Sequence, residues 1–211
     1  PLTEISGNMD LQELADKYNM LIVTPYLYNW FYIDKPGREV SRFLCEELRD
    51  ELDGLFDMKD FDYFLAGISM GGYGSLLVGL NHPECFKGIG SISGAFISSD
   101  IEIANPEVVG NTDEKERRQY YIDTFGPLDD YETSKERNPE AVIKELNSES
   151  TLPPIILTTG TYDFMHARNI RVKELLEKQG VELVFKAYQD MGHEYSCFSR
   201  GLNDILENWF N

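Results

Sequence analysis

The feature that most constrains this chain is a glycine-flanked serine at residues 67–71, which read Gly-Ile-Ser-Met-Gly. An apolar run precedes this motif and a helix-like pattern follows it, so G-x-S-x-G lies between a strand and a helix. A sharp turn there predicts strained backbone at Ser69 and no room for side chains at Gly67 and Gly71. It also aims the first amides of the helix at the serine hydroxyl. We therefore predict a nucleophilic serine, against the alternative of a glycine-rich structural turn.

Apolar runs typical of buried strands alternate along the chain with amphipathic stretches typical of helices. We expect strands at residues 20–24, 63–66, 86–94, 154–160 and 181–187. We expect helices from Asp10, at 40–55, at 72–80, at 167–179 and at 198–210. This order predicts one α/β domain over residues 1–211, with a mainly parallel sheet flanked by helices. Residues 98–150 are acidic and lack a sheet-like run, so we expect them to form an insertion over the active site.

Composition narrows the class of partner. The chain of 211 residues carries a net charge of −18, which argues against nucleic acid and anionic membranes as partners. Its three cysteines are odd in number and fit no metal-site spacing. No apolar run reaches transmembrane length and no signal peptide is visible. We expect a cytoplasmic protein without metal or organic cofactor, and the sequence leaves a homo-oligomer open.

A serine nucleophile needs a base, and the chain has three histidines. His82 lies in a helix-ending turn beside a proline, which is typical of a structural residue. His166 opens a predicted helix, where surface or capping roles are common. His193 follows the last predicted strand, in the loop where this fold class supplies its base. We therefore predict His193, with His166 as the alternative.

The base needs a carboxylate that fixes its tautomer and stabilises its protonated form. Asp163 follows directly on the strand predicted at residues 154–160. The order Ser69, Asp163, His193 is the one expected of α/β-hydrolases. Asp190 and Glu194 are close to His193 in sequence, but so short a loop does not bring them round to the ring nitrogen. The sequence therefore predicts a triad of Ser69, His193 and Asp163.

Together with this order, several motifs give the chain a resemblance to the esterase D-like family of α/β-hydrolases. The motifs lie at residues 6–8, 29–34, 67–74, 125–126, 160–163 and 192–194. That family includes short-chain acyl and acetyl esterases, feruloyl and acetylxylan esterases, S-formylglutathione hydrolases and mycolyltransferases. Within it, the chain is most similar to the small tributyrin or acetyl esterases.

The resemblance implies a serine carboxylesterase that hydrolyses short acyl esters of small molecules or carbohydrates through an acyl-enzyme, without a cofactor. It leaves open a feruloyl or acetylxylan esterase and an S-formylglutathione-type thioesterase. A non-catalytic binding module on a hydrolase scaffold is the alternative from another class. The resemblance also implies that the Met70 amide serves the oxyanion hole. Ile5 is the candidate for the second donor.

The substrate pocket is expected among aromatic residues. Tyr28 and Trp30 belong to an aromatic loop after the strand predicted at residues 20–24, and Phe164 follows Asp163. Loops at the carboxyl edge of a parallel sheet are where ligands bind. We therefore expect these three residues and the insertion to form the pocket walls. Packing beneath a long loop is the alternative for the aromatic loop.

One family feature is missing. A buried strand ending in His-Gly is expected just before residues 6–8, and residues 3–5 do not match it. That strand would lie inside the sheet, where unpaired backbone groups cost roughly 1–3 kcal/mol each. We therefore expect the native polypeptide to continue N-terminal to Pro1, by roughly 40–60 residues.

Overall fold

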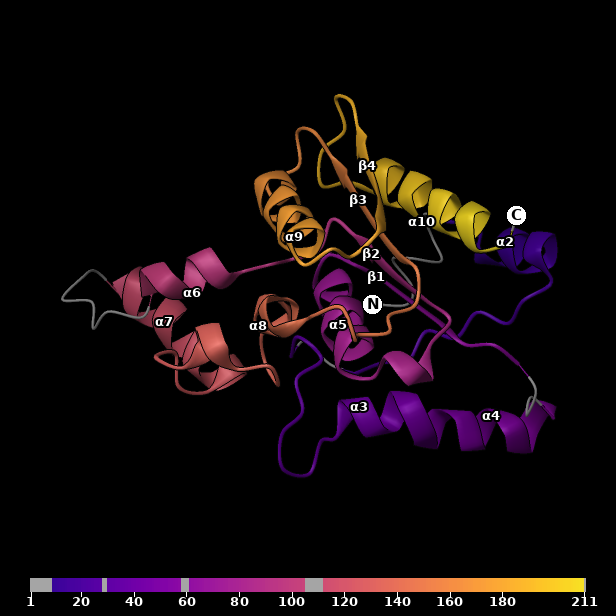
Figure 1. Cartoon of the computed structure of the whole chain (residues 1–211), viewed down its shortest axis with the longest axis horizontal. Coiled ribbons are helices and arrows are strands. Elements are labelled where there is room, and N and C mark those ends of the chain that lie inside the picture. The colour runs from indigo at the N-terminus through magenta and orange to yellow at the C-terminus, as the bar shows by residue number, and fades with distance from the viewer. Residues whose placement is uncertain (1–8, 28–29, 58–60, 105–111, 211) are drawn as a thin grey trace.

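A parallel sheet organises the computed structural model, which describes residues 9–27, 30–57, 61–104 and 112–210 (Figure 1). Its strands run in the order β1 (Phe64–Ile68), β2 (Gly88–Ile92), β3 (Ile155–Gly160) and β4 (Leu183–Tyr188). Every neighbouring pair is parallel. The four strands lie where the sequence predicts strands, and the α/β fold class is confirmed.

Helices cover both faces of this sheet. Helices α5 (Met70–Asn81) and α9 (His166–Lys178) cover one face, and α10 (Tyr195–Phe210) covers the other (Figure 1). Side chains alternate across a strand, so Ile155 and Leu157 pack with α5 and α9 while Ile156 packs with α10. Because β3 is covered on both faces, all of its residues are buried, including the polar Thr158 and Thr159 at its carboxyl end.

Two helical segments precede the sheet in sequence. Helix α2 (Leu11–Tyr18) begins where Asp10 accepts a hydrogen bond from the Glu13 amide at 2.9 Å. The helix predicted at residues 40–55 consists of α3 (Val40–Arg42), the π-helical segment η1 (Phe43–Glu47) and α4 (Leu48–Phe56). Val40 and Leu44 pack against α5, so this helix encloses the far side of α5.

Within residues 98–150, the regular elements of the described part are helices and turns, and no strand forms there. They contain α6 (Ser98–Ala104), α7 (Thr112–Phe125), the 3-10 turn η3 (Tyr131–Thr133) and α8 (Pro139–Glu145). Helix α8 packs against α5 and α9, whereas α6 and α7 extend away from the sheet (Figure 1). Phe125 and Tyr131 are buried in the same cluster as Tyr73 of α5. The segment therefore shares the main core.

The strand predicted at residues 20–24 is wrong. This stretch carries no regular secondary structure, and Leu21 and Val23 are 47% and 39% exposed. A strand requires a neighbour that accepts and donates its backbone hydrogen bonds. Among the described strands, β1 pairs only with β2 and none lies beside residues 20–24. Apolar composition alone does not supply such a partner.

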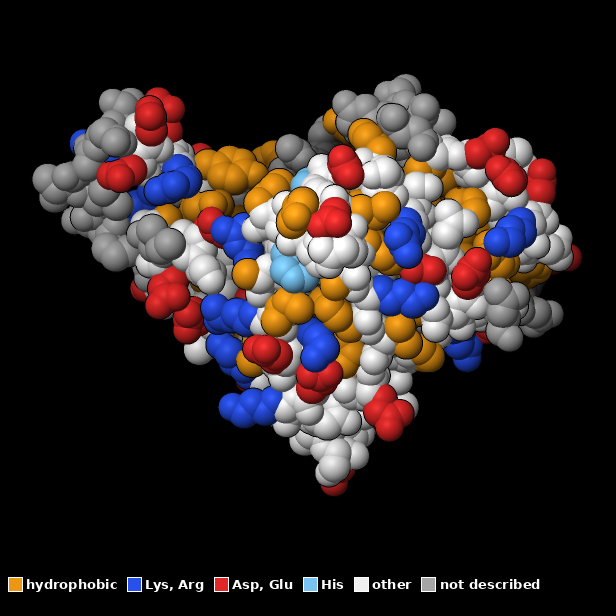
Figure 2. Space-filling model, turned by 90° about the horizontal axis from the view of Figure 1, so that it is seen from above, with side chains coloured by type: hydrophobic (Ala, Val, Ile, Leu, Met, Phe, Trp, Pro, Cys, Tyr) orange, Lys and Arg blue, Asp and Glu red, His pale blue; other side chains and the backbone are white. Residues whose placement is uncertain are grey.

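The surface carries mixed charge. Figure 2 shows acidic side chains spread over the visible face, with Lys and Arg between them and hydrophobic side chains around a histidine. Dispersed acids are solvated individually, which fits the net charge of −18 without a single acidic binding patch on that face. Among the residues that the structure describes, no helix is both long enough and apolar enough to span a bilayer.

Candidate active site

Ser69 occupies the turn between β1 and α5, with φ of 55° and ψ of −113°. The strained backbone expected of this serine is present. A Cβ atom on Gly67 would lie 2.1 Å from the Gly71 carbonyl oxygen, so the turn closes only with glycine there. The same expectation is wrong for Gly71, whose added Cβ would meet its nearest atom at 3.6 Å. The tight position is Gly72, because its Cβ would lie 2.7 Å from the Ser91 hydroxyl.

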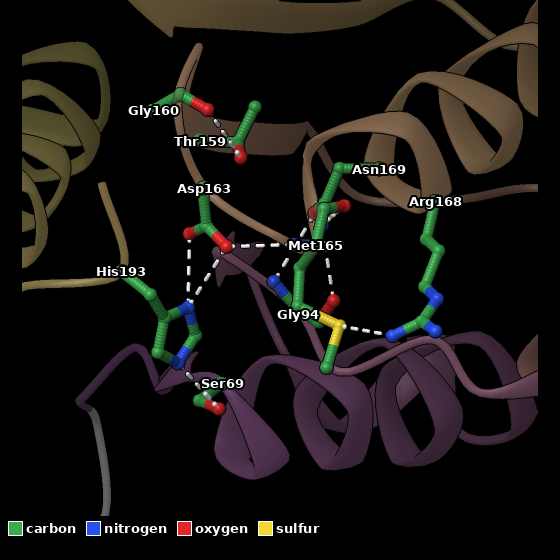
Figure 3. A network of polar contacts seen from close by, with 9 residues as sticks. All are labelled: Ser69, Gly94, Thr159, Gly160, Asp163, Met165, Arg168, Asn169 and His193. Carbon is green, nitrogen blue, oxygen red and sulfur yellow. Dashed lines mark hydrogen bonds and ion pairs between the residues drawn. The ribbon is translucent and has the colours of Figure 1, made fainter. Parts of the chain in front are cut away.

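His193 lies in the loop between β4 and α10 and contacts both other predicted triad residues (Figure 3). Its Nε2 is 3.0 Å from Ser69 Oγ. Its Nδ1 is 2.9 and 3.0 Å from the two carboxylate oxygens of Asp163. Two aromatic rings contact the imidazole, with centroids at 4.6 Å for Phe164 and 4.9 Å for Phe198. The ring therefore has fixed polar partners and apolar neighbours.

Asp163 follows the carboxyl end of β3, and its side chain is fully buried. One carboxylate oxygen accepts a 2.7 Å hydrogen bond from the Met165 amide as well as facing His193. Buried carboxylates require such partners, because an unpaired charge in the interior is costly. The Met165 amide therefore holds the carboxylate in the orientation that meets the imidazole.

This arrangement places a hydroxyl, an imidazole and a carboxylate in one line of contacts. Such a line can move the serine proton to the imidazole while the carboxylate stabilises the resulting imidazolium. The Met70 amide is the first of helix α5, and the first amides of a helix have no intrahelical acceptor. It is therefore free to bind negative charge that develops beside Ser69.

The remaining predicted site residues are the alternative base, the pocket aromatics and the second oxyanion donor. His166 is bound through its backbone amide to the Asp163 carbonyl at 2.9 Å, and its Nδ1 has no hydrogen-bond partner in the described structure. Trp30 is 41% exposed, with the Arg38 guanidinium 4.3 Å from its ring. Phe164 is 67% exposed beside His193. Tyr28 and Ile5 lie outside the described residues.

Two residues near the site were not singled out from the sequence. Phe198 was expected only as core of the closing helix, yet its ring meets the His193 imidazole at 81°. Its spacing of five residues from His193 was a usable signal. Asn169 interrupts the apolar face of α9 and bonds to Gly94 (Figure 3). A fully buried amide on an apolar helix face is a signal that the sequence alone shows only weakly.

Comparisons with known proteins bear on the family and the fold of this chain. Residues 34–208 match the family described as "Putative esterase". An acetyl esterase of Caldicellulosiruptor saccharolyticus is 28% identical over 200 residues, which is 92% of this chain and 73% of that protein. An S-formylglutathione hydrolase of Staphylococcus aureus superposes with a TM-score of 0.78 at 19% identity, covering 99% of this chain and 79% of that one. A ferulic acid esterase superposes at 0.67, with the same identity and coverage.

Proposed function

The chain belongs to this esterase family and is a carboxylic ester hydrolase, and we propose that Ser69, His193 and Asp163 are its catalytic triad. The observation that carries the proposal is the pair of contacts on His193, at 3.0 Å to the serine hydroxyl and 2.9 Å to the carboxylate. A serine hydroxyl becomes nucleophilic only when a base removes its proton. His193 is the histidine with that contact in the described structure.

In the first half of the reaction, Ser69 Oγ attacks the ester carbonyl carbon while His193 Nε2 accepts the hydroxyl proton. The carbonyl oxygen becomes an oxyanion, which the Met70 amide binds at the start of α5. Loss of one such donor typically raises the barrier by roughly 3 kcal/mol. When the tetrahedral intermediate collapses, the bond to the alcohol oxygen breaks and His193 protonates the leaving alcohol.

In the second half, water hydrolyses the acyl-enzyme. His193 Nε2 takes one proton from the water as its oxygen attacks the acyl carbon, and then returns a proton to Ser69 Oγ. The carboxylic acid leaves and the serine is restored. Asp163 keeps Nδ1 protonated throughout, so that Nε2 is the nitrogen that exchanges protons.

The substrates are small-molecule esters, and we propose that short acyl groups of the acetyl type are preferred. The similarity to an acetyl esterase supports this choice. Aryl esters are the second candidate, favoured by the exposed Phe164 ring at the edge of the imidazole. An aromatic leaving group could stack on the exposed part of the Phe164 ring with little rearrangement of the protein.

The proposal is tested with a fluorophosphonate probe and p-nitrophenyl acetate. Ser69→Ala should lose both labelling and turnover, on the order of a million-fold in kcat, because the triad acts as a unit. Ser196→Ala is the matched control, since that exposed hydroxyl donates to the Glu194 carboxylate at 2.9 Å. The proposal fails if Ser69→Ala still turns over ester at the control rate. A non-catalytic binding module would show neither labelling nor turnover in the wild type.

A further inference from the structure

Asn169 of α9 is completely buried, and its side-chain amide is bonded on both sides (Figure 3). Its Oδ1 accepts a hydrogen bond from the Gly94 amide at 3.1 Å. Its Nδ2 donates to the Gly94 carbonyl at 3.0 Å and to the Met165 carbonyl at 2.9 Å. The side chain therefore joins two backbone segments that are far apart in sequence.

The first of these segments is bonded to the nucleophile. Gly94 follows strand β2, and the next residue, Ala95, donates its amide to the Ser69 carbonyl at 2.9 Å. On the other side of Gly94, the Ile92 carbonyl accepts the Ser69 amide at 2.8 Å. The backbone of Ser69 is thus held by residues two before and one after Gly94. Any shift of Gly94 is passed to the serine.

The second segment is bonded to the acid. Met165 donates its amide to the Asp163 carboxylate at 2.7 Å, while its carbonyl accepts from Asn169. A continuous series of hydrogen bonds and short covalent backbone links therefore runs from Asp163 through Met165, Asn169 and Gly94, and on through Ala95 and Ile92, to Ser69. This series does not pass through His193. Together with the two contacts of His193, it closes a ring of bonds that includes Ser69, His193 and Asp163.

We propose that Asn169 is a positioning residue, which sets the separation of Asp163 and Ser69 so that one imidazole meets both. The proposal rests on the triad proposed above. The imidazole is rigid, so its two contacts of 3.0 and 2.9 Å hold only when the carboxylate and the hydroxyl are correctly spaced. Removing the amide releases Gly94 and Met165 from each other, and the acid and nucleophile can then drift apart.

Asn169 is a polar residue on a helix face whose next inward positions are apolar. Val172 and Leu176 occupy the following inward positions of the same helix, and both are completely buried. An apolar residue at 169 would continue that face but would leave the Gly94 amide without its side-chain acceptor. Its carbonyl and that of Met165 would each lose one donor but keep a backbone donor, the Phe96 amide and the residue-169 amide respectively. The Gly94 amide is then the unsatisfied group, and such a buried group costs about 1–3 kcal/mol. A stability effect is therefore certain, so a separate readout is needed for positioning.

The test compares Asn169→Ala and Asn169→Asp with Asn138→Ala. Asn138 is a matched control because it is also buried, at 1% exposed, and its side chain also bonds to backbone groups. Its Oδ1 accepts from the Glu140 amide, and its Nδ2 donates to the Tyr131 carbonyl. The aspartate variant keeps the shape and the acceptor oxygen of the side chain, and in its neutral form it can donate to one carbonyl at most, so it serves if the alanine variant does not fold. Each variant is assayed below its measured unfolding temperature for kcat, KM and the rate of fluorophosphonate labelling.

We expect both Asn169 variants to lose about 10²-fold in kcat and in labelling rate, with KM near the wild-type value, as for a misplacement of about 1 Å. Asn138→Ala should lose stability while kcat stays at the wild-type level. The inference is overturned if a folded Asn169 variant turns over as fast as Asn138→Ala, or if its loss lies in KM. Ser69→Ala separates the two claims, because an active Ser69→Ala enzyme refutes the triad itself.

Discussion

Replacing Gly160 with alanine should displace His193, the proposed catalytic base, without changing its side chain. Gly160 is the last residue of β3, and a Cβ atom there would lie 2.1 Å from the Met191 carbonyl oxygen. Ordinary contact begins at 3.4 Å, so the carbonyl must retreat by about 1.3 Å. Met191 lies two residues before His193, and its carbonyl also accepts the Tyr162 amide at 2.9 Å. The displacement is therefore applied to the loop that carries His193.

A misplacement of about 1 Å costs on the order of 10²-fold in rate. That corresponds to about 2.7 kcal/mol in the barrier. The assay is kcat/KM for p-nitrophenyl acetate, measured with thermal unfolding of the same preparations. Gly192→Ala is the matched control, because an added Cβ there meets no atom within 4 Å. If Gly160→Ala turns over as fast as Gly192→Ala, the close approach of β3 to this loop does not position His193.

Three further changes test other contacts. Phe164→Ala should lower kcat/KM for phenyl acetate more than for ethyl acetate, because the exposed ring is lost; an unchanged ratio would contradict stacking. Burial raises the pKa of the thiols of Cys45, Cys85 and Cys197. Because the thiolate is the reactive form, iodoacetamide at pH 8 should alkylate the folded protein more slowly than free cysteine. Arg171→Ala should lower the free energy of unfolding in urea by about 1–3 kcal/mol, since it strands the buried Glu140 carboxylate 3.0 Å away. Arg171→Lys should recover part of that loss.

The fold and the three residues of the proposed triad could be predicted because both depend on local sequence. Strands β2 and β3 are buried on both faces, so apolar and small residues run through them without charged side chains. Ser69 follows β1, Asp163 follows β3, and His193 lies in the loop after β4. Parallel strands place their carboxyl ends on one edge, so position in sequence translates into position in space.

What the sequence did not predict depends on partners from distant segments. Residues 20–24 have the composition of a strand, but pairing is a property of two segments and composition reports only one. Gly71 was expected to be sterically required, whereas the crowded neighbour is Gly72, because the Ser91 hydroxyl comes from another strand. The bonds of Asn169 to Gly94 span 75 residues, so no local pattern announces them.

Helix α9 is bonded to α6 as well as to the segment that follows β2, and this couples the effects of changes in the two helices. Arg168 pairs with Asp100 of α6 at 2.8 Å, and Arg171 donates to the Ser99 hydroxyl at 3.2 Å. Asn169 lies between these two arginines in sequence and faces Gly94. A substitution in α6 that breaks either contact would therefore act on the helix that carries Asn169. Because residues in contact are energetically coupled, substitutions in α6 and α9 should be non-additive in their effect on the free energy of unfolding.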